Sequence, residues 1–228
     1  AESVNKCLSP LFEGIKQLYE NGLLDSMVYT SVYGKYLSTK KTVYNPIVEE
    51  KTIRYLTPEQ LKEFIDIYHN MKRQRTWEIM QMFLFSVNSG LRISDIVTLE
   101  WSHINISKKI LKKNMVKTKE VIEIHLNKSA MDIIKMWKQY GRNNRFVFDL
   151  MKEDVDFNDR DYVYKKIASK NRIIQTSLRS IGVKMKLPFS LTFHVARHTF
   201  AVFALRKNQN LYVVSKLLGH TSIRATEK

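Results

Sequence analysis

The sequence predicts a mainly α-helical protein with a small antiparallel β-sheet, an α+β fold. Apolar residues recur at helical spacing over most of the chain, and glycines follow several of these segments as helix stops. Between residues 104 and 126 the pattern changes to short runs rich in isoleucine and valine, as strands require. A chain of 228 residues with 44% hydrophobic residues can bury one large core, so we expect one main domain and a small appendage.

The first fifty residues are predicted to be a separate and incomplete unit. Apolar residues between 8 and 19 recur at helical spacing, and Gly22 is a suitable helix stop. The segment 38–46 has no apolar period and indicates a basic linker. Because one helix cannot form a domain, residues 1–50 are expected to be the end of a truncated helical domain plus the linker, and residues 51–228 the main domain.

The main domain begins with a clear helix start. Thr57 is a good N-cap, Pro58 suits the first helical position, and Gln60 completes a capping box. Further helices are predicted from apolar spacing at 77–89, 93–99, 130–140, 162–181, 192–208 and 212–218. Four of these helices are expected to end at a glycine: Gly90, Gly141, Gly182 and Gly219. Thr192 is the expected N-cap of the helix 192–208.

A small basic sheet is predicted between Ile104 and Leu126. Alternate positions from Val121 onward are isoleucine or leucine, as in a half-buried strand, and residues 117–120 form the expected turn before it. Seven lysines and two glutamates fall between residues 107 and 128. The hairpin is therefore basic whichever of its lysines has a specific function.

The charge balance predicts a polyanionic partner. The formal net charge is +16 and the sequence pI is about 9.8. Because lysine and arginine on phosphates release condensed counterions, nucleic acid is the expected partner. An anionic membrane surface would attract the same charge, but no apolar run of about 18 residues could span a bilayer, and no signal peptide is recognised at Ala1. The single cysteine, Cys7, rules out an internal disulfide and fits a reducing compartment.

Two arginines are candidates for holding a phosphate. Phosphoryl transfer places charge on the non-bridging oxygens, and the planar, permanently charged guanidinium can bind two of them. Arg92 follows Gly90 at a predicted helix end, from which its side chain could reach a cleft or pair with Asp95 in a surface salt bridge. His194 and Arg197 lie three residues apart on one helix face, where a histidine could exchange protons beside a bound phosphate. A buried histidine bonded to a backbone carbonyl is the alternative for His194.

The same helix also has the spacing of a possible zinc site. His194 and His198 have the i, i+4 spacing of two metal ligands. Val195 stands where a metalloprotease needs glutamate, and the chain has no cysteine cluster to complete a structural site. We therefore expect no metal.

Taken together and in order, four segments resemble the tyrosine recombinase (phage integrase) family, most of all the integrases of bacterial mobile elements. They are the segment from Ser89 to Asp95, the basic hairpin, the segment from His194 to Ala201, and the segment from Leu217 to Ser222. Asp95 replaces the glutamate of many members, a conservative departure. The resemblance covers about residues 50–228 and implies the family's catalytic-domain fold, with residues 1–50 as the end of its core-binding domain and the linker.

The resemblance implies catalytic roles for Arg92, Lys117, His194, Arg197 and His220. The two arginines would hold the scissile phosphate and His220 would donate a hydrogen bond to it. Lys117 would protonate the leaving 5′ oxygen. A tyrosine would attack the phosphate, and the resulting 3′-phosphotyrosyl link would keep the ester's energy until a second strand's hydroxyl reverses the step, so no metal or other cofactor is implied.

Two questions about this chemistry stay open in the sequence. Lys119 is the alternative to Lys117 on the hairpin. The family's tyrosine usually follows the Leu-Gly-His histidine by nine positions, just beyond Lys228, so we expect residues 1–228 to lack the nucleophile and to be inactive in cleavage.

The resemblance also implies double-stranded DNA as partner, self-association on that DNA, and a bacterial cytoplasmic location at the nucleoid. Two other functions remain possible: a catalytically inactive DNA-binding protein on the same fold, and a type IB topoisomerase. The full set of candidate residues argues against the first. The small size and the Leu-Gly-His segment argue against the second.

Overall fold

The computed structural model describes residues 13–26, 28–29, 54–207 and 209–219. The chain divides into two compact units, residues 1–52 and 53–228, which are described separately. In the first unit a helix over 13–20 ends in a turn at Gly22, whose φ of 68° favours glycine. The rest of the predicted first helix and the predicted linker lie outside the described residues.

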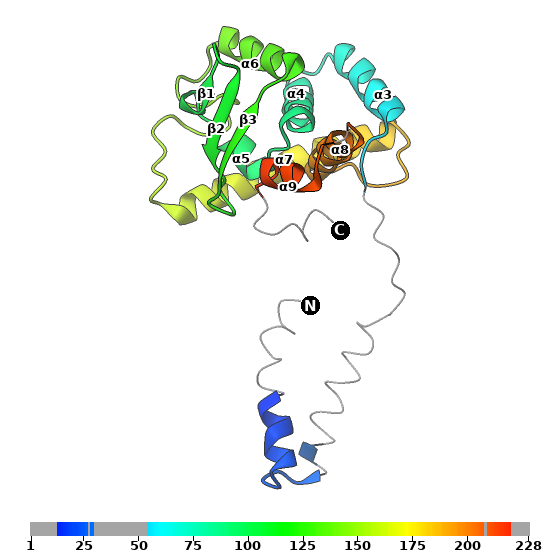
Figure 1. The fold of residues 1–228 in the computed structure, drawn as a ribbon, viewed down its shortest axis with the longest axis vertical. Coiled ribbons are helices and arrows are strands. Elements are labelled where there is room, and N and C mark those ends of the chain that lie inside the picture. Colours follow the sequence, from blue (N-terminus) through cyan, green and yellow to red (C-terminus); the bar gives the residue numbers. More distant parts are fainter. Residues whose placement is uncertain (1–12, 27, 30–53, 208, 220–228) are drawn as a thin grey trace. The chain divides into compact units, whose positions relative to one another are not determined.

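The second unit is mainly helical with a small antiparallel sheet, which confirms the predicted fold class (Figure 1). Its helices are α3 (Pro58–His69), α4 (Gln74–Ser89), α5 (Ile93–Val97), α6 (Lys128–Tyr140), α7 (Arg160–Lys184), α8 (Phe193–Arg206) and α9 (Leu211–Leu217), with the 3-10 turn η1 (Trp101–His103) after α5. Its strands are β1 (Ile104–Asn105), β2 (Ile110–Asn114) and β3 (Val121–His125). Among the described residues, no helix is long and apolar enough to cross a membrane.

The three strands form a meander in the order β1-β2-β3. Leu111 of β2 pairs with Ile104 on one side and with Ile124 on the other. Ile122 and Ile124 are buried and their neighbours along β3 are exposed, so the predicted alternation is confirmed. The turn between β2 and β3 covers residues 116–118, so it begins one residue and ends two residues before the predicted turn.

Helix α4 is the centre of the core. Most of its residues are buried, and it packs against α6, α7 and α8. Aromatic contacts tie it to its neighbours: Phe83 lies edge-on to Phe193 of α8, and Phe85 lies edge-on to Phe148. A long buried helix of this kind gives a rigid support for groups placed at its ends.

The predicted helix ends are confirmed where a nearby side chain or a glycine caps the helix. The Thr57 hydroxyl accepts from the Gln60 N–H, and the Gln60 side chain accepts from the Thr57 N–H at 3.0 Å, which completes the capping box. Gly90 and Gly141 end α4 and α6 with φ of 69° and 57°. Thr192 does precede α8, but its side chain makes no capping hydrogen bond.

Gly182 does not end α7, contrary to the prediction. The helix continues to Lys184, and Gly182 is buried inside it. A Cβ at this position would lie 2.7 Å from the Cβ of Leu191, in the connection to α8. The glycine is therefore needed because two segments approach closely, and not because the helix stops there.

Candidate active site

Arg197 is the most firmly fixed of the predicted site residues. It lies in the first turns of α8 and is only 3% exposed. Its Nη1 donates to the Gly90 carbonyl at 2.8 Å and its Nη2 to the Leu218 carbonyl at 2.5 Å. Both carbonyls stand at helix ends, where they have no partner within their own helix. Arg197 therefore joins the ends of α4 and α9 and is itself held in one position.

The close approach of these three helices depends on Gly90. Its left-handed φ of 69° ends α4, and a Cβ there would lie 2.7 Å from the Phe200 ring of α8 and 3.1 Å from Leu218. At the other side, a Cβ on Gly219 would lie 3.2 Å from Ile122 and Met115 of the hairpin. The sequence predicts both glycines as helix stops. The structure adds that they allow α4, α8, α9 and the hairpin to meet (Figure 1).

Arg92 lies at the start of α5, two residues beyond Gly90, and is half-buried. Its Nη1 is buried and has no hydrogen-bond partner among the described residues. Burial lowers the pKa of its guanidinium, and the charge of Asp95 acts in the opposite direction. A buried cationic donor without a partner is costly, by about 1–3 kcal/mol or more. An anion at this point would remove that cost.

Asp95 does not form a salt bridge with Arg92 within the described residues, so the structure does not show the alternative considered for Arg92. It is fully buried, and its Oδ1 accepts from the Val116 N–H, at the turn of the hairpin, at 2.8 Å. Burial raises the pKa of this carboxyl; the Val116 N–H and the charges of Lys113, Arg92 and Arg197 oppose the rise. Asp95 thus connects the segment that carries Arg92 to the hairpin turn that carries Lys117.

The catalytic lysine candidates lie on that turn. Lys117 is exposed, and its positive charge is close enough to His194 to lower the pKa of the imidazole. Lys119 is also exposed and has a left-handed φ of 60°, with its N–H donating to the Met115 carbonyl at 3.0 Å. The structure therefore brings Lys117 toward the histidine–arginine group. His220, the remaining predicted site residue, lies outside the described residues.

His194 stands at the start of α8 beside these cations. Its imidazole retains exposed surface, but the surrounding atoms desolvate it and lower its pKa to about 4. The nearby charges of His198, Arg197, Arg92 and Lys117 contribute to this lowering. The rings of His194 and His198 meet edge-on, with centroids 4.4 Å apart. At neutral pH the imidazole of His194 is therefore uncharged in the absence of an anion.

The cluster can bind and stabilise an anion. The charges of Arg92, Arg197 and Lys117 all act on His194, and burial lowers the pKa of Arg197 to about 9, with the charge of Arg92 adding to the effect. Asp95 is the carboxylate that opposes the shifts of both arginines. No group of three histidine, cysteine or acidic side chains in the described part of the chain could hold a metal ion.

Sequence reasoning missed two residues that support the site. Lys113 of β2 is only 6% exposed, and its Nζ donates to the Thr98 carbonyl at 2.9 Å, close enough to Asp95 to affect its pKa. It shares the inward positions of the strand with Leu111 and Met115, so strand alternation could have identified it. Thr199, one turn after Val195 on α8, accepts from the Leu56 N–H at 2.9 Å and so fixes the start of the second unit to the site helix.

Comparison with known proteins agrees with this arrangement. The sequence profile described as the phage integrase family matches residues 54–228. The integrase of Salmonella phage P22 is 25% identical over 198 residues, which are 85% of this chain and 48% of that protein. The tyrosine recombinase XerD of Pasteurella multocida is 27% identical over 190 residues, 80% of this chain and 59% of that protein. The chain thus spans about half the length of these curated relatives.

Solved structures show the same fold. The Tn1549 transposon integrase, determined in complex with a circular intermediate DNA, matches with a TM-score of 0.61 and 16% identity, over 96% of this chain and 79% of that one. The catalytic core of lambda integrase matches with a TM-score of 0.52 and 17% identity, over 73% of this chain and 91% of that one. Residues 54–228, which the family profile matches, include every element that builds the site. The chain belongs to the phage integrase family of tyrosine recombinases.

Proposed function

We propose that this chain contains the phosphate-binding and proton-transfer groups of a site-specific DNA recombinase, which cuts and rejoins DNA through a 3′-phosphotyrosyl link. The observation that carries the proposal is the buried Nη1 of Arg92, which has no partner among the described residues and lies beside the fixed guanidinium of Arg197. A scissile phosphate supplies the oxygen that this donor lacks. Family membership and the DNA-bound structures of relatives support the same substrate.

Each of the predicted site residues then has a separate role. Arg92 and Arg197 stabilise the charge on the non-bridging oxygens as the phosphorus becomes five-coordinate. His194, uncharged without DNA, gains affinity for a proton when the phosphate binds and can exchange it with the attacking or leaving group. Lys117 protonates the 5′ oxygen as it leaves. His220 donates a hydrogen bond to the same phosphate.

We propose further that the nucleophilic tyrosine is not one of residues 1–228. Tyr212, the tyrosine nearest the Leu-Gly-His segment in sequence, is 53% exposed at the start of α9, and its ring lies 5.7 Å from the Lys216 ammonium. This pairing accounts for the side chain without a role in cleavage. Residues 1–228 are accordingly expected to bind DNA and to be inactive in strand cleavage.

The expected partner is double-stranded DNA, on which copies of the protein assemble. The net charge of +16 supports an affinity that is largely electrostatic. Because cleavage and exchange involve two duplexes, self-association on DNA follows from the proposed reaction.

A nicked suicide substrate tests the proposal. In such a duplex the short 5′ fragment diffuses away after cleavage, so a covalent protein–DNA adduct accumulates and survives denaturation. Residues 1–228 should bind the duplex without forming the adduct, whereas a chain extended through the expected tyrosine should form it. An adduct mapped to any tyrosine within 1–228 would disprove the placement of the nucleophile. An extended chain that binds but never forms an adduct would instead support the inactive DNA-binding protein.

A further inference from the structure

A second hollow lies far from the site described above, between the start of α4 and the second half of α7. Its volume is about 720 Å³. Four cationic side chains line it, Arg73 and Arg75 from the start of α4 and Arg172 and Lys184 from α7. Four hydroxyl side chains lie among them: Thr76, Thr176, Ser177 and Ser180.

The positive charge of this hollow is not neutralised within the described residues. No aspartate or glutamate lines it, and none of its four cations forms an ion pair there. Glu78, one turn along α4, is engaged elsewhere: its Oε1 accepts from Arg142 at 2.6 Å and from Gln74 at 3.1 Å. Four like charges around one cavity repel one another, so the cavity favours an anion.

The start of α4 adds to this preference. Arg73 stands at the N-cap position, where no side chain makes a capping hydrogen bond, and the first turn contains no acidic residue. The first backbone N–H groups of a helix have no carbonyl partner within it, and the helix dipole places positive potential there. Helix α4 has 16 residues. The backbone N–H groups at its start, together with the arginine side chains and the hydroxyls, are the kinds of hydrogen-bond donor that bind phosphate.

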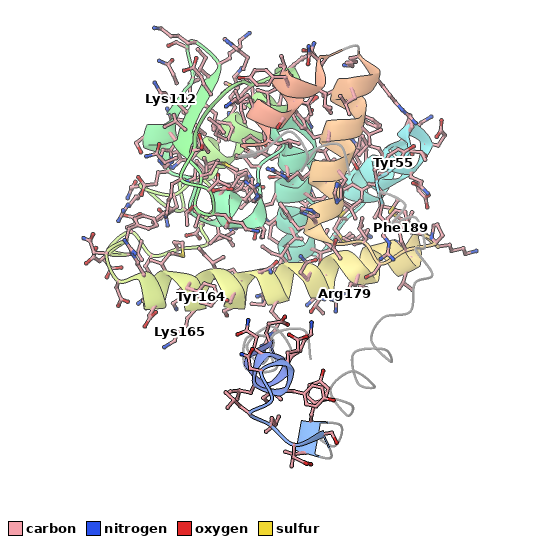
Figure 2. The ribbon with its side chains drawn as sticks, turned by 60° about the horizontal axis from the view of Figure 1, so that its bottom comes forward. Tyr55, Lys112, Tyr164, Lys165, Arg179 and Phe189 are labelled. Carbon is pink, nitrogen blue, oxygen red and sulfur yellow. The ribbon has the colours of Figure 1, made fainter. Side chains whose placement is uncertain are left out.

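The hollow is separated from the catalytic arginines by the length of α4. Sixteen residues at 1.5 Å each give about 24 Å between its start and Gly90. Helix α7 extends along the edge of the unit, with Tyr164, Lys165 and Arg179 directed outward from it (Figure 2). A duplex whose axis followed this separation would therefore be held about seven base pairs from the cleaved phosphate, since the phosphates of one strand are spaced about 3.4 Å apart along the duplex axis.

We propose that the hollow formed by Arg73, Arg75 and Arg172 is a second phosphate-binding site, which takes a backbone phosphate of duplex DNA away from the cleavage centre. The assignment rests on the proposed function for the identity of the ligand. The preference of the hollow for phosphate does not depend on the proposed function, because any phosphate ester or free phosphate would meet the same donors. The functional consequence is a longer grip on DNA, which compensates for the small size of the catalytic unit.

Salt-dependent DNA binding by residues 1–228 tests the site. The triple variant Arg73→Gln/Arg75→Gln/Arg172→Gln is compared with Lys128→Gln/Lys135→Gln/Lys138→Gln, which removes the same charge from exposed positions of α6, none of which lines the hollow. If the arginines contact two or three phosphates, the slope of log affinity against log salt should fall by about 2–3 in the first variant. The slope should fall by less than about 1 in the second. Equal changes in both would overturn the proposal.

Two further arms separate the possible outcomes. Arg73→Lys/Arg75→Lys/Arg172→Lys keeps the charge and should retain most of the slope, which shows that a loss in the glutamine variant is not misfolding. Inorganic phosphate, compared with chloride at equal ionic strength, should raise the unfolding temperature of the parent chain and not of the glutamine variant. If phosphate stabilises the parent chain but the slope of log DNA affinity against log salt is unchanged in the glutamine variant, the hollow binds free phosphate and not DNA. That result would overturn the DNA assignment. Failure of cleavage in an extended chain would leave these results untouched.

Discussion

The two sides of the candidate site are built differently. On the arginine side, Arg197 is buried and bonded to two helix-end carbonyls, and it stands on a helix that packs along α4. On the hairpin side, Lys117 is exposed on a three-residue turn, and the hydrogen bond from the Val116 N–H to Asp95 connects that turn to the arginine side. One side is fixed by the core, and the other is connected to it through a buried carboxylate.

This difference matches the two tasks of the proposed reaction. Charge on the phosphate oxygens is best stabilised by donors that need no rearrangement when the charge develops. A proton donor must instead follow the leaving oxygen as it separates from phosphorus. A rigid phosphate clamp formed by the arginines and a movable proton donor on the hairpin are therefore the expected division.

The largest effect is expected at the fixed side. Arg197→Lys, in a chain extended through the tyrosine, keeps one charge but cannot bond two carbonyls and a phosphate oxygen together, so single-turnover cleavage should fall by about 10²–10³-fold. DNA affinity should change little because the side chain is only 3% exposed. Arg206→Lys, at the exposed end of the same helix, is the control. Near-normal cleavage by Arg197→Lys would remove this arginine from the clamp.

The next largest effect is expected at Gly90, which allows the helices around Arg197 to pack closely. Gly90→Ala forces alanine into a left-handed conformation and places its Cβ 2.7 Å from the Phe200 ring. The free energy of unfolding, measured in urea, should therefore be about 2–4 kcal/mol lower than in the parent. Gly141→Ala is matched, because its φ is 57° but no atom lies within 4 Å of the added Cβ. It should lose only about 1 kcal/mol. Equal losses would mean that the three-helix junction is not tightly packed.

The connection between the two sides is tested at Asp95. Asp95→Asn keeps an oxygen for the Val116 N–H, whereas Asp95→Ala removes it and should cost about 1–2 kcal/mol at this hydrogen bond. Amide hydrogen exchange at Val116 should therefore accelerate by roughly tenfold in the alanine variant and much less in the asparagine variant. If both exchange at the parent rate, the hairpin is held by something other than Asp95.

The smallest effect concerns pH. Burial lowers the pKa of His103 to about 4, whereas the unfolded chain protonates this imidazole near 6.5. Between these values the unfolded state binds more protons, so stability is present above pH 6.5 and is lost as the pH falls toward 4. His103→Gln should reduce that loss by about 1 kcal/mol. His125→Gln, exposed on β3, is the control. The raised pKa of Asp95 acts in the opposite sense, since its stabilising effect is lost as the pH rises through that pKa.

Local patterns predicted the framework of the site well. Thr57, Gly90 and the alternation of Ile122 and Ile124 are signals that neighbouring residues alone can satisfy, and all three appear in the structure as predicted. The same holds for placing His194 and Arg197 on one helix.

Contacts between distant segments could not be predicted in this way. The sequence allowed Asp95 to pair with Arg92 three residues away, but its hydrogen-bond partner is the backbone of Val116 on the hairpin. Gly182 was expected to stop a helix, but its position is set by Leu191 in the following connection. In each case a short sequence pattern allowed two structures, and packing against another segment selected the one observed.

The division between clamp and proton donor is tested most directly by a DNA substrate whose 5′ bridging oxygen is replaced by sulfur. A thiolate leaves without a proton, so this substrate removes the need for a general acid and leaves the need for phosphate binding unchanged. In the extended chain it should restore most of the cleavage lost in Lys117→Ala and none of that lost in Arg197→Lys, while Lys119→Ala should show little defect on either substrate. Rescue of Lys119→Ala instead would move the donor two residues along the turn. Rescue of neither lysine variant would contradict a proton-donating hairpin.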